Sequence, residues 1–365
     1  MPSRAWQVPE VDAICHFLLY GANGYTGRLI LSRALALGLR PLLAGRNAGE
    51  IAALAEEHAL DHRSFGLDDA AALERTLEAV PVVLHAAGPF SRTALSMVEA
   101  CIRTGTHYTD ITGEIGVFER LHAEGARARD AGVMLLPGAG FDVVPTDLLA
   151  AHLTRRLPTA THLRLAFHSP GGTISRGTAL TMVENMAEGG AVRSNGRITR
   201  VPAAWRTRTV DFGFGTRPVS VTTIPWGDVA TAYRSTGIPN IEVYTRMTSG
   251  QRRLLTASRR LRRVLRTRVI QRMVKGVVRA RVRGPGEERR RTAVSLIHGE
   301  VEDGADGRAV ARMRGPEGYT LTAMTSVEIV RRVLAGTAPA GFQTPSLAYG
   351  PDWILELGVE RQDET

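Results

Sequence analysis

Three glycines, Gly21, Gly24 and Gly27, are spaced three residues apart directly after an apolar run at 17–20. Apolar residues then recur at helical spacing from Leu29 onward. A strand, a tight turn and a helix start together bring main-chain amides toward an anion such as a pyrophosphate. A turn without a ligand is the alternative. The residues predicted to bind a pyrophosphate are Gly21, Asn23, Gly24, Tyr25, Thr26 and Gly27.

The end of the next apolar run indicates which dinucleotide binds. In NAD-binding proteins an acidic residue about 20 residues after the glycines bonds the ribose 2′-hydroxyl. Here Gly45, Arg46 and Asn47 occupy that place. A guanidinium attracts a 2′-phosphate that a carboxylate would repel. These three residues therefore favour NADP(H) over NAD, and the alternative for Arg46 is a solvated loop position.

The run at 81–90 is expected to place a loop beside the reactive ring of the cofactor. Ala87 and Gly88 are small, so a flat ring can approach the backbone there. Pro89 is expected to stiffen the loop, and Phe90 to pack beside the ring. A plain strand-to-helix turn is the alternative.

A second such loop follows the apolar run at 132–136. Gly140 and Phe141, with Asp142 after them, are expected beside the nicotinamide in a cleft between two domains. The equally weighted alternative is a glycine-rich domain junction followed by a helix whose N-cap is Thr146 or Asp147.

Tyr108, Asp110 and Glu114 lie near the end of another predicted strand, where ligands bind in sheets of this kind. Tyr108 is the best candidate of the three for a proton donor, because a positioned hydroxyl suffices to protonate an enolate. The alternative is a partly buried tyrosine whose hydroxyl is satisfied within the protein.

These residues need a scaffold, and residues 11–150 supply one by alternating short apolar runs with helical patterns. Continuous apolar strands predict a doubly wound α/β domain of the Rossmann type, with a parallel sheet covered on both faces. Residues 151–318 alternate as half-buried strands do and predict an α+β substrate domain with a mostly antiparallel sheet. Residues 319–365 are expected to form helices that pack back on the first domain.

Several chemistries lack the residues that they need. Lys275 is the only lysine and has Gln271 four residues before it, so the Tyr-x-x-x-Lys pair of short-chain dehydrogenases is absent. Gly-Lys-Ser/Thr and Gly-x-Ser-x-Gly are absent too, which excludes the ATPase phosphate loop and the hydrolase elbow. His58 and His62 have the spacing of helical metal ligands but no third partner nearby, so no metal site is expected.

The net charge of +10 comes from one segment. Residues 251–284 contain thirteen Arg and Lys and no acid, which leaves 33 basic and 36 acidic residues elsewhere. Leu254, Leu261, Leu265, Val269 and Met273 recur at spacings of four and seven, so 251–275 is expected to be a basic amphipathic helix. Packing into the core, docking to an acidic carrier and contact with an anionic membrane all remain open. No aromatic residue in the segment could stack on bases, so nucleic acid is not expected.

The motifs resemble a known family. GANGYTG, AGRN, AAGPF, THYTDITGE and PGAGFDVVPTDLLA are similar to segments of the saccharopine dehydrogenase-like oxidoreductases. GGTISRGTALTMVENM and IPWGDVATAYRSTGIPNIEVY resemble the bacterial branch that includes trans-acting enoyl reductases. The resemblance spans most of residues 14–350.

The resemblance implies an NADPH-dependent enzyme whose second domain closes over the nicotinamide. Its substrate would be an α,β-unsaturated acyl thioester of polyketide or lipid biosynthesis, carried on an acyl carrier protein or polyketide synthase. One alternative is a reductase of an amino-acid or imine substrate, and another is a non-catalytic NADP-binding regulatory or membrane-associated protein. The apolar run at 13–22 is too short to span a bilayer. A cytoplasmic protein, peripheral to the membrane if 251–284 binds lipid, is expected, and a homo-oligomer remains open.

Overall fold

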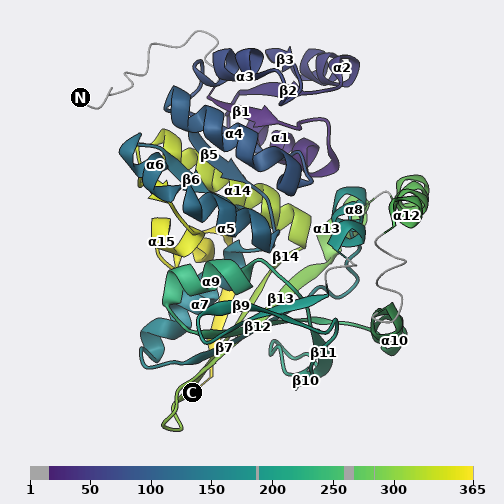
Figure 1. The fold of residues 1–365 in the computed structure, drawn as a ribbon, viewed down its shortest axis with the longest axis vertical. Helices are drawn as coiled ribbons and strands as arrows, with labels where there is room; N and C mark the ends of the chain where they lie inside the picture. Colours follow the sequence, from purple (N-terminus) through teal and green to yellow (C-terminus); the bar gives the residue numbers. More distant parts are fainter. Residues whose placement is uncertain (1–15, 186–188, 259–266, 283, 365) are drawn as a thin grey trace.

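The structure is a computed structural model that describes residues 16–185, 189–258, 267–282 and 284–364. Its first sheet, in the upper half of Figure 1, is seven-stranded and parallel, in the order β15-β6-β5-β4-β1-β2-β3. The strands are β1 (Phe17–Tyr20), β2 (Pro41–Gly45), β3 (His62–Ser64), β4 (Val82–His85), β5 (His107–Asp110), β6 (Met134–Leu136) and β15 (Gly341–Phe342). The predicted doubly wound α/β fold is confirmed.

The strands of this sheet are apolar because helices cover both of its faces. Phe17 and Leu19 of β1 point into one core, and Leu18 and Tyr20 point into the other. Helices α1, α2 and α14 contribute to the first core, while α3, α4 and α5 contribute to the second. Their bounds, with α6, are α1 (Tyr25–Ala36), α2 (Ala48–His58), α3 (Ala70–Leu77), α4 (Phe90–Thr104), α5 (Ile115–Ala123), α6 (Gly125–Asp130) and α14 (Gly318–Leu334).

The second sheet, below the first in Figure 1, runs in the order β10-β11-β12-β7-β13-β14-β16, with β8 beside β12 and β9 beside β8. Its strands are β7 (His162–His168), β8 (Gly190–Ser194), β9 (Arg197–Val201), β10 (Thr207–Val210), β11 (Val219–Thr223), β12 (Asn240–Arg246), β13 (Val294–Glu302), β14 (Arg308–Pro316) and β16 (Glu360–Asp363). Among these pairs only β7 and β12 run parallel. The expected mostly antiparallel sheet is therefore confirmed.

One face of the second sheet packs against α7 (Val144–Arg156), and α9 (Asp228–Thr236) lies against both α7 and β12. Leu163 and Leu165 of β7 share a core with Leu149 and Leu153 of α7, and this core is continuous with that of the first sheet. The boundary expected at residue 150 falls inside α7. The tail contributes to both sheets through β15 and β16, with α15 (Pro345–Tyr349) and the 3-10 helix η1 (Trp353–Leu357) between them.

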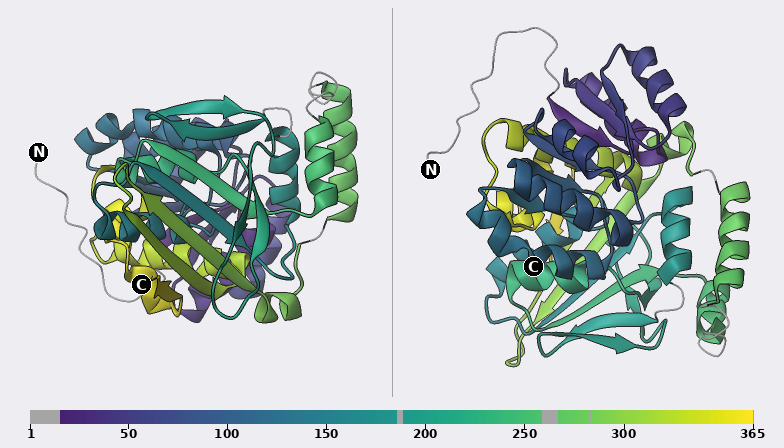
Figure 2. Two further views of the ribbon diagram at one scale, coloured as in Figure 1. Left: turned by 90° about the horizontal axis from the view of Figure 1, so that it is seen from below. Right: turned by 45° about the horizontal axis from the view of Figure 1, so that its top comes forward.

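The basic segment lies at one side of the molecule (Figures 1 and 2). The structure describes two helices there, α10 (Ser249–Ser258) and α12 (Arg268–Arg281), followed by α13 (Glu287–Thr292). Helix α12 packs on α8 (Arg176–Asn185). Leu261 and Leu265 of the predicted stripe lie outside the described residues. Met273 is 64% exposed, so the stripe does not pack wholly into the core. Among the described residues, no helix is both long enough and apolar enough to cross a membrane.

Candidate active site

The glycine turn packs too tightly to accept side chains. Gly21 has φ +87° and lies against the end of β4, where an added Cβ would be 2.9 Å from the backbone nitrogen of Ala87. A Cβ on Gly27 would be 2.3 Å from the carbonyl oxygen of Gly21. These contacts bring β1, β4 and the start of α1 together at the carboxyl edge of the sheet, where doubly wound proteins bind ligands.

The start of α1 is open. Its N-cap is Gly24, and among the described side chains none caps it. The amides of the first helical turn, Tyr25 to Gly27, have no acceptor within the helix. Their positive dipole end also lacks an acidic neighbour in the first turn. The start of α1 therefore offers the donors that a phosphate group needs, and its binding of a pyrophosphate stays a prediction.

The start of α2 carries a carboxylate that the sequence analysis missed. Asn47 is the N-cap, and its side chain accepts from the Glu50 amide. The Glu50 carboxylate in turn receives the side-chain amides of Asn23 and Asn47, both at 2.7 Å. Arg46 is exposed beside this cluster. The Asn-x-x-Glu spacing of a capping box was the signal that could have located Glu50.

The loop after β4 is held in place at the same edge. The Ala86 amide donates to the carbonyl of Tyr20 on β1 at 2.8 Å, and the Thr93 hydroxyl donates to the carbonyl of Ala87 at 2.9 Å. Residues 86–89 are at least partly exposed. The ring of Phe90 is instead buried, edge-on against His85 with centroids 5.3 Å apart. This contradicts the expectation that Phe90 packs beside the cofactor, because its ring points into the core.

Tyr108 is also in the core. Its side chain is 0% exposed, and its hydroxyl donates to Asp110 Oδ2 at 2.5 Å. Burial and the Asp110 charge raise the pKa of Tyr108 well above its usual value. The other oxygen of Asp110 accepts the amides of Thr112 and Gly138, so the pair joins the ends of β5 and β6. The predicted role of Tyr108 as proton donor is contradicted, because a buried hydroxyl bound to a carboxylate cannot reach a substrate.

Glu114 binds the start of α4. Its carboxylate accepts the amides of Phe90 and Ser91 at 2.8 and 3.1 Å. A carboxylate at a helix N-terminus is favoured by the helix dipole. Glu114 therefore acts as a cap supplied from the loop after β5, and α4 is closed where α1 is open.

The loop after β6 is fixed by α14. The Phe141 amide donates to the Thr322 hydroxyl at 3.0 Å, and a Cβ on Gly140 would be 2.8 Å from a Thr322 methyl carbon. The Thr325 hydroxyl also donates to the carbonyl of Ala139 at 2.7 Å. These contacts hold Gly140, Phe141 and the following residue at the carboxyl edge between β5 and β6.

Asp142 differs from the other acids at this edge. Its carboxyl lies beside Gly113, where an added Cβ would be 2.8 Å from Oδ2. Within the described part of the chain, no hydrogen bond or ion pair reaches this carboxyl. The residue is half-buried, and desolvation raises its pKa to about 7. A carboxyl of this kind can hold and release a proton near neutral pH.

Two further carboxyls lie deeper behind this loop. Asp147 is 0% exposed and accepts the Ser235 hydroxyl and the Ser346 amide, so it joins α7 to α9 and α15. Asp228 is also 0% exposed, and burial raises its pKa well above the usual value. Helix α7 has Val143 as its N-cap without a side-chain cap, so the alternative of a Thr146 or Asp147 cap is wrong.

Aromatic side chains line the second sheet beside Asp142. The rings of Phe141 and Phe167 are 5.7 Å apart, and those of Phe167 and Trp226 are 4.8 Å apart. All three residues are half-buried. Because Phe141 precedes Asp142 and Phe167 lies near the end of β7, this aromatic wall joins the parallel sheet to the second one.

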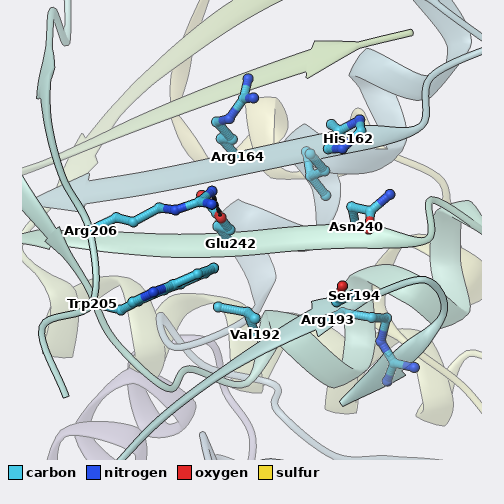
Figure 3. A pocket seen from close by; sticks show the side chains of 10 residues that line it. His162, Arg164, Val192, Arg193, Ser194, Trp205, Arg206, Asn240 and Glu242 are labelled. Carbon is cyan, nitrogen blue, oxygen red and sulfur yellow. Dashed lines mark hydrogen bonds and ion pairs between the residues drawn. The ribbon is translucent and has the colours of Figure 1, made fainter. Parts of the chain in front are cut away.

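A separate pocket of about 170 Å³ opens on the opposite face of the second sheet (Figure 3). Arg206 stacks on Trp205 and forms an ion pair with Glu242, while Arg164 pairs with Glu300 and Glu302. The sheet separates this pocket from α7, because Leu165 of β7 lies in the core shared with α7 while the preceding Arg164 lines the pocket. Its charges are paired, and none of the predicted cofactor residues lines it.

The fold and this edge define a doubly wound α/β protein with a candidate dinucleotide-binding site. Residues 17–136 match the family model described as the saccharopine dehydrogenase NADP binding domain. This part of the chain is therefore similar to the NADP-binding domain of that family, in agreement with the motifs.

Curated relatives match 38% of the chain. A trans-acting enoyl reductase of Mycobacterium leprae (strain TN) is 40% identical over 154 residues, which cover 38% of this chain and 35% of that protein. A trans-acting enoyl reductase of Mycobacterium ulcerans (strain Agy99) is 33% identical over 149 residues, with the same coverage. The match therefore spans about a third of the length of these relatives.

Among solved structures, the apo histidine-tagged saccharopine dehydrogenase (L-Glu forming) of Saccharomyces cerevisiae superposes with a TM-score of 0.66. The alignment covers 96% of this chain and 100% of that one, at 12% identity. This likeness establishes the fold of both sheets, beyond the part matched by the family model. The chain thus resembles the NAD(P)-binding, saccharopine dehydrogenase-like oxidoreductases in its fold and in the sequence of its first domain.

Proposed function

We propose that this protein is an NADPH-dependent reductase that reduces the α,β-double bond of an acyl thioester in polyketide or lipid biosynthesis. The observation that carries the proposal is the arrangement at one sheet edge. The open start of α1 lies at this edge, and so does the unpaired carboxyl of Asp142. The first is suited to a dinucleotide and the second to delivery of a proton.

The residues present fit NADPH. The first-turn amides of α1, from Tyr25 to Gly27, would hold the pyrophosphate. Exposed Arg46 would pair with the 2′-phosphate and so favour NADPH over NADH. The negative charge of Glu50 beside it would reduce this preference for NADPH. The small residues 86–88 leave the backbone accessible to a flat ring. When bound, the cofactor supplies a hydride to the β-carbon of the substrate.

Asp142 would supply the proton. As a C–H bond forms at the β-carbon, the π electrons of the double bond move toward the thioester carbonyl. The carboxyl O–H of Asp142 then breaks, its proton forms the new bond at the α-carbon, and the carboxylate regains a proton from water. A pKa of about 7 keeps a substantial fraction of this group protonated at neutral pH.

The chemistry of the aromatic wall supports an acyl substrate. Phe141, Phe167 and Trp226 offer apolar surface next to Asp142. An acyl chain gains from burial against such rings, whereas an amino-acid substrate would need paired charges there. The relatives named trans-acting enoyl reductases support an enoyl substrate. Delivery of this substrate on a carrier protein is part of the proposal.

The test is product analysis with purified protein and NADPH. We expect a crotonyl thioester to consume one NADPH per butyryl thioester formed, with deuterium from D₂O at the α-carbon. An imine formed from an amino acid, tested in parallel, should not be reduced. Reduction of the imine alone would establish the amino-acid reaction instead. NADPH binding without turnover of either substrate would indicate a non-catalytic protein.

A further inference from the structure

Helix α12 exposes an apolar stripe to solvent. Met273 and Val277 are 64% and 55% exposed, and their spacing of four places them on one helix face. Ile270, Val274 and Val278 are half-buried on another face. Packing on α8 therefore uses only part of the apolar surface of α12.

The neighbouring helix extends this apolar surface. Ile174, just before α8, is 45% exposed, and Met182 on α8 is 50% exposed. The two helices lie side by side at the edge of the molecule (Figure 2). They form a partly apolar surface, which we term the α8–α12 face and define by Ile174, Met182, Met273 and Val277.

Only positive charge comes from the segment that carries α12. Residues 251–284 hold thirteen basic residues and no acidic one. Among them, Arg253, Arg272 and Arg281 are exposed. Apolar side chains flanked by arginine suit a bilayer surface, since the guanidinium groups stay at the phosphate level while the apolar groups enter the interface.

The α8–α12 face adjoins the candidate active site through two tyrosines. The Tyr25 hydroxyl donates to the carbonyl of Pro285 at 2.7 Å, just after α12. The Tyr319 hydroxyl accepts the amide of Ser175, just before α8. The rings of Tyr25 and Tyr319 meet edge-on, 5.1 Å apart. These contacts hold the segment after α12 and the segment before α8 next to the glycine turn.

We propose that the α8–α12 face binds an anionic lipid surface and places the candidate active site next to it. A bilayer requires only a plane of negative charge over an apolar layer, which matches exposed apolar side chains beside a segment, 251–284, whose charges are all positive. A folded acidic partner would instead need hollows that fit four protruding side chains. The inference goes beyond the proposed reaction and does not depend on it, because binding is measured without turnover.

Vesicle sedimentation tests the proposal with the full chain. We expect binding to vesicles of phosphatidylcholine with 30% phosphatidylglycerol, weak binding to pure phosphatidylcholine, and release in 0.5 M NaCl, at which charges are screened within about 5 Å. The double variant Arg272→Gln/Arg281→Gln should bind about thirtyfold more weakly, or about fivefold for each charge. Met273→Asp/Val277→Asp should reduce binding at least as much.

Matched controls lie elsewhere on the surface. Leu347, on α15, is 49% exposed, so Leu347→Asp adds a charge at an equally exposed apolar position. Arg63→Gln/Arg75→Gln removes two exposed arginines of the first domain. Both controls should bind vesicles like the parent protein. Circular dichroism and NADPH affinity identify any variant that has lost its fold. If Met273→Asp/Val277→Asp does not fold, Arg272→Gln/Arg281→Gln still tests the face.

Three results would overturn the proposal. One is equal binding to neutral and anionic vesicles, and another is equal loss of binding in the face and control variants. The third is binding to a purified acidic acyl carrier protein, weakened by the face variants, without binding to anionic vesicles. That last result would assign the face to a protein partner.

Discussion

Two helices, α1 and α4, start at the carboxyl edge of the same sheet, but the first amides of the two helices have different partners. The first amides of α4 are bound by the Glu114 carboxylate. The first amides of α1 follow Gly24, with no side-chain cap among the described residues. Both starts have the same dipole and the same unsatisfied donors. The difference shows which start the protein closes for itself and which one it leaves for a ligand.

The carboxyls at this edge show the same contrast. Glu114 is held by two amides, whereas the nearby Asp142, which lies against Gly113, has no partner among the described residues. A carboxylate bound by amides is a structural cap, and a desolvated one without partners is chemically available. The open helix start and the available carboxyl are therefore the two features that the proposed reaction uses.

The largest effect is expected at Asp142. Asp142→Asn should lower kcat by about 100- to 10,000-fold, because the amide cannot deliver a proton. NADPH affinity should stay within about threefold of the parent, since Asp142 is not placed to hold phosphate. Stopped-flow reduction of a crotonyl thioester measures the first and fluorescence titration the second. An unchanged kcat would show that another group donates the proton.

The pH dependence provides a second readout for Asp142. Because desolvation raises its pKa to about 7, kcat should fall as pH rises through that value. The raised pKa also means that the stability contributed by the protonated form is present at low pH and lost as pH rises from about 4 through about 7. Asp142→Asn removes this loss, so thermal unfolding at pH 8 should occur at a higher temperature in the variant.

The next largest effect is expected at Gly27. In Gly27→Ala the new Cβ would meet the carbonyl oxygen of Gly21 at 2.3 Å, so α1 must move away from β1. We expect about a hundredfold loss of NADPH affinity, together with about 1–3 kcal/mol lower free energy of unfolding. Gly116→Ala is the matched control, because a Cβ there has no neighbour within 4 Å. Equal affinity in both variants would place the pyrophosphate elsewhere.

Local patterns were sufficient to predict the parallel sheet and the glycine turn. The buried strands are continuous apolar runs, and the turn lies between a strand and a helix within a short stretch of chain. Strand β3 has three exposed residues and offers no such run. Strands β15 and β16 come from the tail and join different sheets. Strand β15 pairs with β6, which lies more than 200 residues earlier in the chain, and such a pairing leaves no local signal.

The roles of the acidic and aromatic residues depend on contacts between distant segments. Glu114 caps a helix that starts 24 residues earlier, and Tyr108 is buried because β5 lies inside the sheet. The sequence places Asp142 beside the nicotinamide as one of two alternatives. Residue types alone do not show that its carboxyl lacks hydrogen-bond partners among the described residues. Phe90 was misplaced because its ring turns toward His85 in the core.

Arg46→Glu sharpens the comparison at the outer end of the cofactor site. The reversal adds a second carboxylate beside Glu50, so we expect about thirtyfold weaker NADPH binding and less than about threefold change for NADH. Arg75→Glu makes the same charge change at an exposed position on α3 and should leave both affinities unchanged. If both cofactors lose affinity equally at Arg46, the residue does not recognise the 2′-phosphate.

The smallest effect on the cofactor is expected at Glu114. Glu114→Ala leaves the amides of Phe90 and Ser91 without their acceptor and should lower the free energy of unfolding by about 1–2 kcal/mol. NADPH affinity should change by less than about threefold, because the phosphates bind at α1 and not at the start of α4, which Glu114 binds in the parent protein. Denaturant unfolding and fluorescence titration measure the two quantities. A large loss of NADPH affinity with unchanged stability would mean that Glu114 serves the ligand, and that the two helix starts belong to one binding site.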